Sequence, residues 1–124
     1  MIEKINRELV RIIKSSGLTP IDDHTNLKTK TMYLSEIYRL RDKGTKTYNK
    51  KHYYTTLYIF EQDNHKASLY ALADRFLDTL EKEFFKDEKE YTFNYRIQRE
   101  GADKILADVG KFYQYSIQLY ITVY

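Results

Sequence analysis

The chain has 124 residues, of which 31% are charged and 42% hydrophobic, and its net charge is +3. This length fits one domain, residues 1–124, that can bury a core without covalent staples. Cysteine is absent, which excludes disulfides and thiolate chemistry and permits a reducing compartment. No apolar run reaches membrane-spanning length, so we expect no membrane partner.

The first expected element is an amphipathic helix over residues 2–16. Its apolar residues recur at helical spacing: Ile2, Ile5, Leu9, Ile12 and Ile13. Gly17 and Pro20 form a stop signal. Because acidic residues lie within this helix, we expect no signal peptide and a cytoplasmic location. Residues 18–31 are polar and irregular, and no strand is predicted there.

A hairpin is expected next. Residues 32–41 fit either a helix or a strand, and we favour a strand because a strong one follows at His52–Phe60 (HYYTTLYIF). The connection Asp42–Lys51 would be long for a hairpin loop, and such loops are often functional.

A second helix should begin after Asp63 or Asn64, either of which can cap it, and should run to about Phe85. Leu72, Phe76 and Leu80 are predicted to face the sheet. Residues 86–90 (KDEKE) indicate a solvated turn, and Tyr91–Arg99 alternates as a strand. Residues 101–110 are predicted to be a connector of undetermined structure.

The final run, Phe112–Tyr124, alternates with period two up to the last residue of the sequence. One face would carry mainly Tyr, Ile, Leu and Val. The other is only half polar, since it carries Phe112, Tyr120 and Tyr124, which we predict to be interface aromatics. A covering helix would account for them equally well. The chain has 13 tyrosines and no tryptophan, and tyrosine suits both sheets and protein contacts.

These elements predict an α+β fold. We expect an antiparallel sheet of about four strands, packed by two helices, in the order α-β-β-α-β-β.

Cations concentrate between Arg39 and Lys51, where six stand against one acid, so that this segment carries +5 and the remainder −2. We predict an interaction arm made of Arg39, Arg41, Lys43, Lys46, Tyr48, Lys50 and Lys51. The arm could contact phosphate groups or an acidic neighbouring subunit, or it could be a solvated hairpin tip.

The residue types of a catalytic site do not come together in the sequence. His24, His52 and His65 have no histidine or cysteine at ligand spacing, and the four glycines are too scattered for a phosphate-binding loop. Ser68 lies near His65 but outside any nucleophile-elbow motif. We therefore predict no catalytic residues, no cofactor, no metal, and a protein that is not an enzyme.

The order of these patterns resembles the tail terminator, or tail completion, proteins of tailed bacteriophages, above all those of contractile-tailed prophages and phage-derived bacteriocins. The similar parts are the strand and helix of Tyr53–Phe85 (with YYTTLYIFEQDN and ALADRFLDTLEKEF) and the ending ADVGKFYQYSIQLYITVY. In such proteins an Asp, a turn and a long aromatic strand close the chain, as Asp108–Tyr124 does here.

The resemblance implies a structural protein that caps the tail tube as a ring, usually a homohexamer, stops its polymerisation and offers the head-docking surface. It implies as partners the protein itself, the tail tube, the sheath protein and a head-completion protein, with DNA contact only in the ring lumen. Its location would be the host cytoplasm during assembly and then the virion or tail-like particle. The alternatives are a head-completion or connector protein, and a small nucleic-acid-binding regulator that uses the 39–51 loop.

Overall fold

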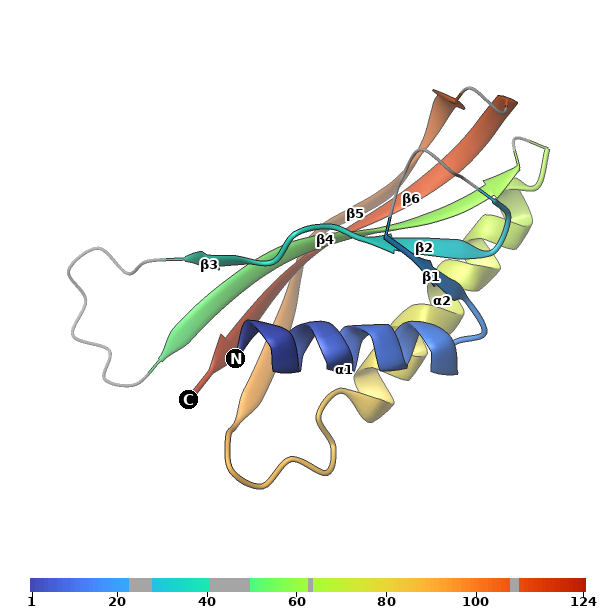
Figure 1. Ribbon diagram of the computed structural model, residues 1–124. Helices are drawn as coiled ribbons and strands as arrows, with labels where there is room; N and C mark the ends of the chain where they lie inside the picture. The colour runs from blue at the N-terminus through green and yellow to red at the C-terminus, as the bar shows by residue number, and fades with distance from the viewer. Residues whose placement is uncertain (23–27, 41–49, 63, 108–109) are drawn as a thin grey trace.

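The computed structural model describes residues 1–22, 28–40, 50–62, 64–107 and 110–124. Two helices and six strands follow one another in these residues (Figure 1). In chain order they are α1 (Ile2–Ser15), β1 (Thr19–Ile21), β2 (Thr31–Leu34), β3 (Tyr38–Leu40), β4 (Lys51–Gln62), α2 (Lys66–Glu83), β5 (Phe93–Ala107) and β6 (Gly110–Val123).

Helix α1 ends where the sequence indicates. Gly17 has a φ of +83°, a left-handed conformation that glycine adopts without a Cβ clash. Its amide donates to the carbonyl of Lys14, and the amide of Leu18 donates to that of Ile13. The predicted helix over residues 2–16 is therefore confirmed to within one residue.

The six strands form one mixed sheet in the order β1-β2-β4-β6-β5, and β3 pairs with the other half of β4. β1 and β2 are parallel, whereas every other pair is antiparallel. The longest pairings join β6 to β4 and to β5. The prediction of a four-stranded antiparallel sheet in the order α-β-β-α-β-β is therefore wrong.

Three local features explain this error. β1 has only three residues, one of them Pro20, so it shows no measurable period. The run 32–41 is two strands, because the chain leaves the ladder between Leu34 and Tyr38. Residues 101–107, predicted to belong to a connector, instead continue β5, whose partner β6 supplies the pairing that its own mixed sequence does not reveal.

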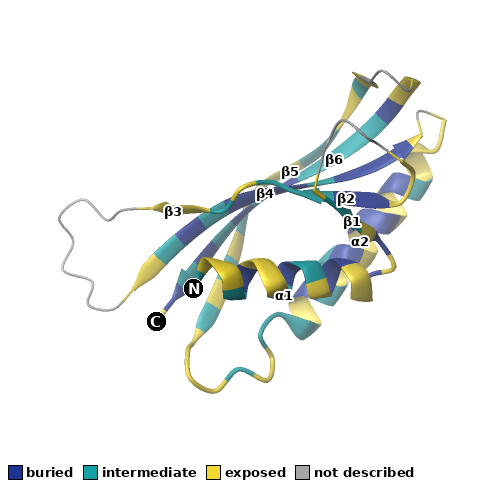
Figure 2. Ribbon diagram, in the orientation of Figure 1, coloured by how far each residue is buried: buried dark blue, intermediate teal, exposed yellow. Residues whose placement is uncertain are grey.

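Both helices lie on the same side of the sheet (Figure 1). Ile5, Leu9 and Ile12 of α1 join α2 residues and the odd-numbered residues of β4 and β6 in one buried cluster. Leu72, Phe76 and Leu80 are all buried there, as predicted. In Figure 2 the buried class marks the inner sides of both helices. The helices thus cover one face of the sheet, which we call the covered face.

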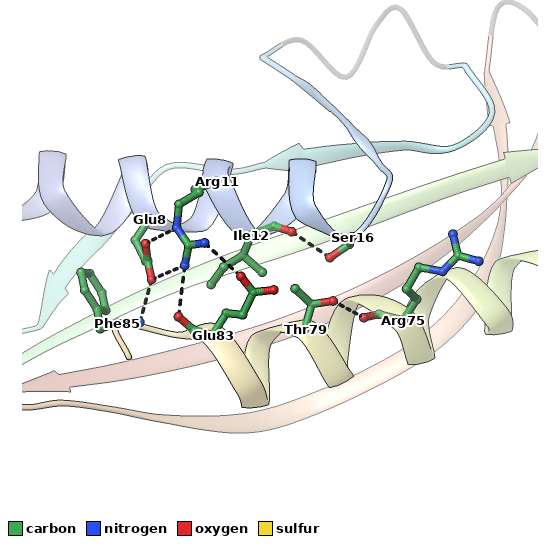
Figure 3. A network of polar contacts seen from close by, with 8 residues as sticks. All are labelled: Glu8, Arg11, Ile12, Ser16, Arg75, Thr79, Glu83 and Phe85. Carbon is green, nitrogen blue, oxygen red and sulfur yellow. Dashed lines mark hydrogen bonds and ion pairs between the residues drawn. The ribbon is translucent and has the colours of Figure 1, made fainter. Parts of the chain in front are cut away.

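A polar network fixes α1 against the end of α2 (Figure 3). Arg11 donates to Glu8 and, across the interface, to the Glu83 carboxylate (3.1 Å) and carbonyl. The Phe85 amide donates to Glu8 at 2.6 Å. Burial alone would raise the pKa of Glu8, but these hydrogen bonds and the Arg11 charge outweigh it and lower that pKa.

Candidate interaction surface

The second face of the sheet is the most distinctive surface of the molecule. None of the helices that the structure describes lies over it (Figure 1). It carries the even-numbered residues of β4 and β6 and the residues paired with them on β2, β3 and β5. We call it the open face.

A row of aromatic residues crosses the open face near the C-terminal end of β6. Tyr38, Tyr54, Tyr120 and Arg96 are successive cross-strand partners on β3, β4, β6 and β5. The rings of Tyr54 and Tyr120 have centroids 5.1 Å apart. The Arg96 guanidinium lies 5.1 Å from the Tyr120 ring centroid, a cation–π distance. Three strands therefore present neighbouring phenol rings in one row, and the fourth strand ends the row with a cation.

A second aromatic group lies at the opposite end of the open face. Tyr33 and Tyr58 are stacked with ring centroids 6.0 Å apart, and Tyr58 stacks on Phe60. Among the described residues, Phe60 and Phe112 form a buried cluster with neighbours on this face, which include Ile21 and Ile105. Lateral contacts between side chains thus form a small hydrophobic cluster, over which no described helix or strand lies (Figure 1).

Exposed side chains border the first row. Tyr38 is 57% exposed and Tyr124 is 42% exposed. Tyr124 accepts a hydrogen bond from the Asn94 amide, and Lys50 lies 5.2 Å from its ring centroid. This corner of the sheet combines accessible rings with positive charge.

The cations of the open face differ from those of α1. On α1, Lys4, Arg7 and Arg11 each form an ion pair. On the open face, Arg96 and Arg99 form no ion pair with any residue that the structure describes. Arg96 faces Tyr120 and Arg99 faces Gln118, because a bulge takes up the residue between Ile97 and Arg99. Arg96 and Arg99 therefore occupy successive positions on the open face of β5, and neither has a carboxylate partner among the described residues.

The three predicted interface aromatics share this face but lie in different parts of it. Tyr120 is in the first row, Tyr124 lies beside it and Phe112 belongs to the cluster at the far end. Of the predicted arm, the structure describes Arg39, Lys50 and Lys51, whereas Arg41, Lys43, Lys46 and Tyr48 lie outside the described residues. The roles assigned to both sets stay predictions.

Sequence reasoning missed most of the open face. It overlooked Tyr33, Tyr38, Tyr54, Tyr58, Arg96 and Arg99. The alternation of HYYTTLYIF carried a usable signal, because Tyr54, Tyr58 and Phe60 fall on one side of that strand. The two arginines could not be placed, since the bulge changes the phase of β5 between them.

The described residues offer little that suits catalysis. Buried Glu61 accepts a hydrogen bond from Ser68 at 2.9 Å, and its other oxygen lies 3.9 Å from the His65 ring. The serine thus bonds to the carboxylate rather than to the histidine, which suits anchoring of the start of α2. Within the described ranges, no group of three His, Cys, Asp or Glu residues could hold a metal ion. Neither described helix is both long and apolar enough to cross a bilayer.

Comparisons with known proteins add little to this description. Neither a protein-family model nor a curated protein matches the sequence. Among solved structures, the chain is similar to the type 4 fimbrial biogenesis protein PilO from Pseudomonas aeruginosa, with a TM-score of 0.43 and 11% identity. The match covers 98% of this chain and 67% of the PilO chain. A similarity this weak carries no argument about fold or function.

Proposed function

We propose that this chain is a structural protein of a phage tail or phage-derived particle, which caps the tail tube as a homo-oligomeric ring. The cap would stop tube polymerisation and offer the surface to which the head docks. The open face is the observation that carries the proposal. Its tyrosines, together with two arginines that form no ion pair within the described part of the chain, give it the composition of a protein contact surface, where Tyr and Arg are enriched.

The order of elements gives further support. The parts of the sequence that resemble tail terminators correspond to β4, α2 and β6. β4 and β6 pair along twelve residues each and supply most of the open face. The segments that carry the resemblance therefore also build the proposed contact surface.

Self-association and tube capping can be tested separately. Analytical ultracentrifugation and native mass spectrometry of the full chain, alone and with purified tail tube protein, should show a closed ring. Electron microscopy should show tubes of limited length bearing the ring at one end. A chain that stays monomeric and also fails to bind the tube protein would refute the proposal.

A matched pair of variants makes this test specific. Tyr38→Ser removes an exposed ring from the open face, and Tyr91→Ser removes a ring that is 39% exposed beside the covered face. Tyr38→Ser should weaken ring formation while the chain stays folded by circular dichroism, and Tyr91→Ser should assemble normally. Equal effects of both changes would show that ring formation does not depend on the open face.

A nucleic-acid-binding regulator is the second candidate, because Arg96 and Arg99 lack carboxylate partners among the described residues. It predicts an affinity for nucleic acid that falls steeply with salt concentration.

A further inference from the structure

The exposed side of α2 carries a second surface, whose carboxylates form no ion pair within the described ranges. Tyr70, Asp74 and Asp78 are exposed and follow one another at intervals of four residues, so they form one line along the helix. We call this line the outer stripe. Tyr70 is 42% exposed and packs edge-on against Tyr115. Asp74 and Asp78 form no ion pair with any described residue.

The spacing of these carboxylates matches that of the open-face arginines. Residues four apart on a helix are separated by about 6 Å along its axis. Arg96 and Arg99 face Tyr120 and Gln118, which lie two residues apart on β6, so they are separated by about 7 Å. One surface therefore presents two cations beside tyrosine rings. The other presents two anions beside a tyrosine at nearly the same interval, with the cations Arg75 and Lys82 along one border of the pair.

We propose that the open face of one copy packs on the outer stripe of α2 in a second copy, with Arg96 and Arg99 opposite Asp74 and Asp78. This inference rests on the proposed ring and names the surfaces that build it. A second copy is the occupant that the charges favour, because the same chain carries both complementary surfaces. The contact also repeats the helix-on-sheet packing that already exists on the covered face.

The position of the two surfaces determines the symmetry of the contact. α2 lies on the covered side of the sheet (Figure 1). Tyr70 packs on Tyr115 of that side, whereas Asp78 lies on the side of the helix opposite the buried residues Phe76 and Leu80. The outer stripe and the open face are therefore separate surfaces on different sides of the sheet. Two copies cannot satisfy both surfaces of each other by a twofold axis. Such a contact is head-to-tail, and it closes into a ring when the rotation between copies permits.

Charge reversal tests the pairing directly. Arg96→Glu with Arg99→Glu, and separately Asp74→Lys with Asp78→Lys, should each weaken self-association at least about tenfold, because like charges would face each other across the contact. The chain with all four changes should regain most of the loss. Sedimentation velocity measures association of the full chain, alone and with tail tube protein, and circular dichroism checks that each variant is folded.

Matched controls reverse the same number of charges elsewhere. Lys86→Glu with Lys89→Glu, and Asp87→Lys with Glu90→Lys, change the exposed turn after α2 and should leave association unchanged. If a glutamate variant does not fold, Arg96→Gln with Arg99→Gln removes the charges at smaller structural cost and should still weaken association several-fold.

The outcomes distinguish this inference from the proposed function. A ring that caps tubes but resists both charge reversals overturns the pairing only. A chain that shows the rescue but caps no tube overturns the tail function only. A wild-type chain that stays monomeric with and without tube protein overturns the pairing. So does tight binding of a fluorescein-labelled single-stranded oligonucleotide that is lost in Arg96→Glu with Arg99→Glu, because the face would then serve nucleic acid.

Discussion

The covered face and the open face are built by alternate residues of the same strands, yet they differ in chemistry. The last buried residues of β6 on the covered face are aliphatic: Ile117, Leu119, Ile121 and Val123. The residues between them on the open face are Gln118, Tyr120 and Thr122, which are half-buried. The two helices exclude water from the first set, whereas the second set keeps polar atoms at the surface.

The difference shows how one strand can serve two purposes. The covered face contributes stability through complete burial of apolar side chains. On the open face, lateral contacts already hold Tyr54, Tyr120 and Arg96 together, so the entropy lost when a partner binds these side chains is small. We expect substitutions on the covered face to change folding and those on the open face to change association.

Phe76→Ala should have the largest effect on stability. Phe76 is fully buried between α2 and the sheet, so its removal leaves a cavity that the surrounding layers cannot fill. The free energy of unfolding, measured by urea denaturation, should fall by about 3–5 kcal/mol. A loss below about 1 kcal/mol would mean that α2 packs by another side.

Phe112→Ala should cost less, although Phe112 is also buried at 6% exposure. Its cluster on the open face has no covering layer among the described elements, so water can enter the space that the ring leaves. Only the transfer free energy is then lost, about 2 kcal/mol. Urea denaturation beside Phe76→Ala compares the two faces, and equal losses would indicate that a further layer covers the open face.

Glu8→Gln should cost about 1–2 kcal/mol above pH 6, because Glu8 holds charged hydrogen bonds from Arg11 and the Phe85 amide. The pKa of Glu8 is lowered in the folded chain from its ordinary 4.5. The associated stability is therefore present above that value and is lost as the pH falls through the lower, folded pKa.

Thermal unfolding between about pH 3 and pH 7 measures this dependence, which Glu8→Gln should flatten. Glu3→Gln is the control, since Glu3 forms its ion pair with Arg7 in solvent and should change stability by less than about 0.5 kcal/mol. An unchanged pH profile in Glu8→Gln would show that the network does not hold α1 to α2.

Long periodic segments of this fold could be predicted from the sequence. The four-residue repeats of α1 and α2 located both helices and the buried positions Phe76 and Leu80, because one wide apolar side is enough to specify a helix. The alternation of β4 and β6 located their central strands. Each of these elements carries its own pattern over at least three turns or five residues.

Elements that depend on their neighbours could not be predicted. β1 forms because Thr19–Ile21 pairs with β2 in a parallel ladder. Three residues are too few to show a hydrophobic period that would predict this pairing. The second half of β5 is a strand because β6 extends beside it. The residues of the open face could not be predicted for the same reason. Its first row joins residues of four strands, and the register between those strands cannot be read from the sequence.

Arg96→Gln should have the smallest effect on stability and so separates folding from association most clearly. Among the residues that the structure describes, the partner of Arg96 is the half-buried Tyr120 ring, a contact that contributes about 0.5 kcal/mol. The midpoint of urea denaturation should therefore barely move.

If the open face receives the α2 carboxylates of a second copy, the same change should weaken self-association several-fold, because a buried aspartate would lose its cation. Sedimentation velocity on the same sample decides between the two roles. A clear loss of stability without any change in association would make Arg96 a residue of the fold alone.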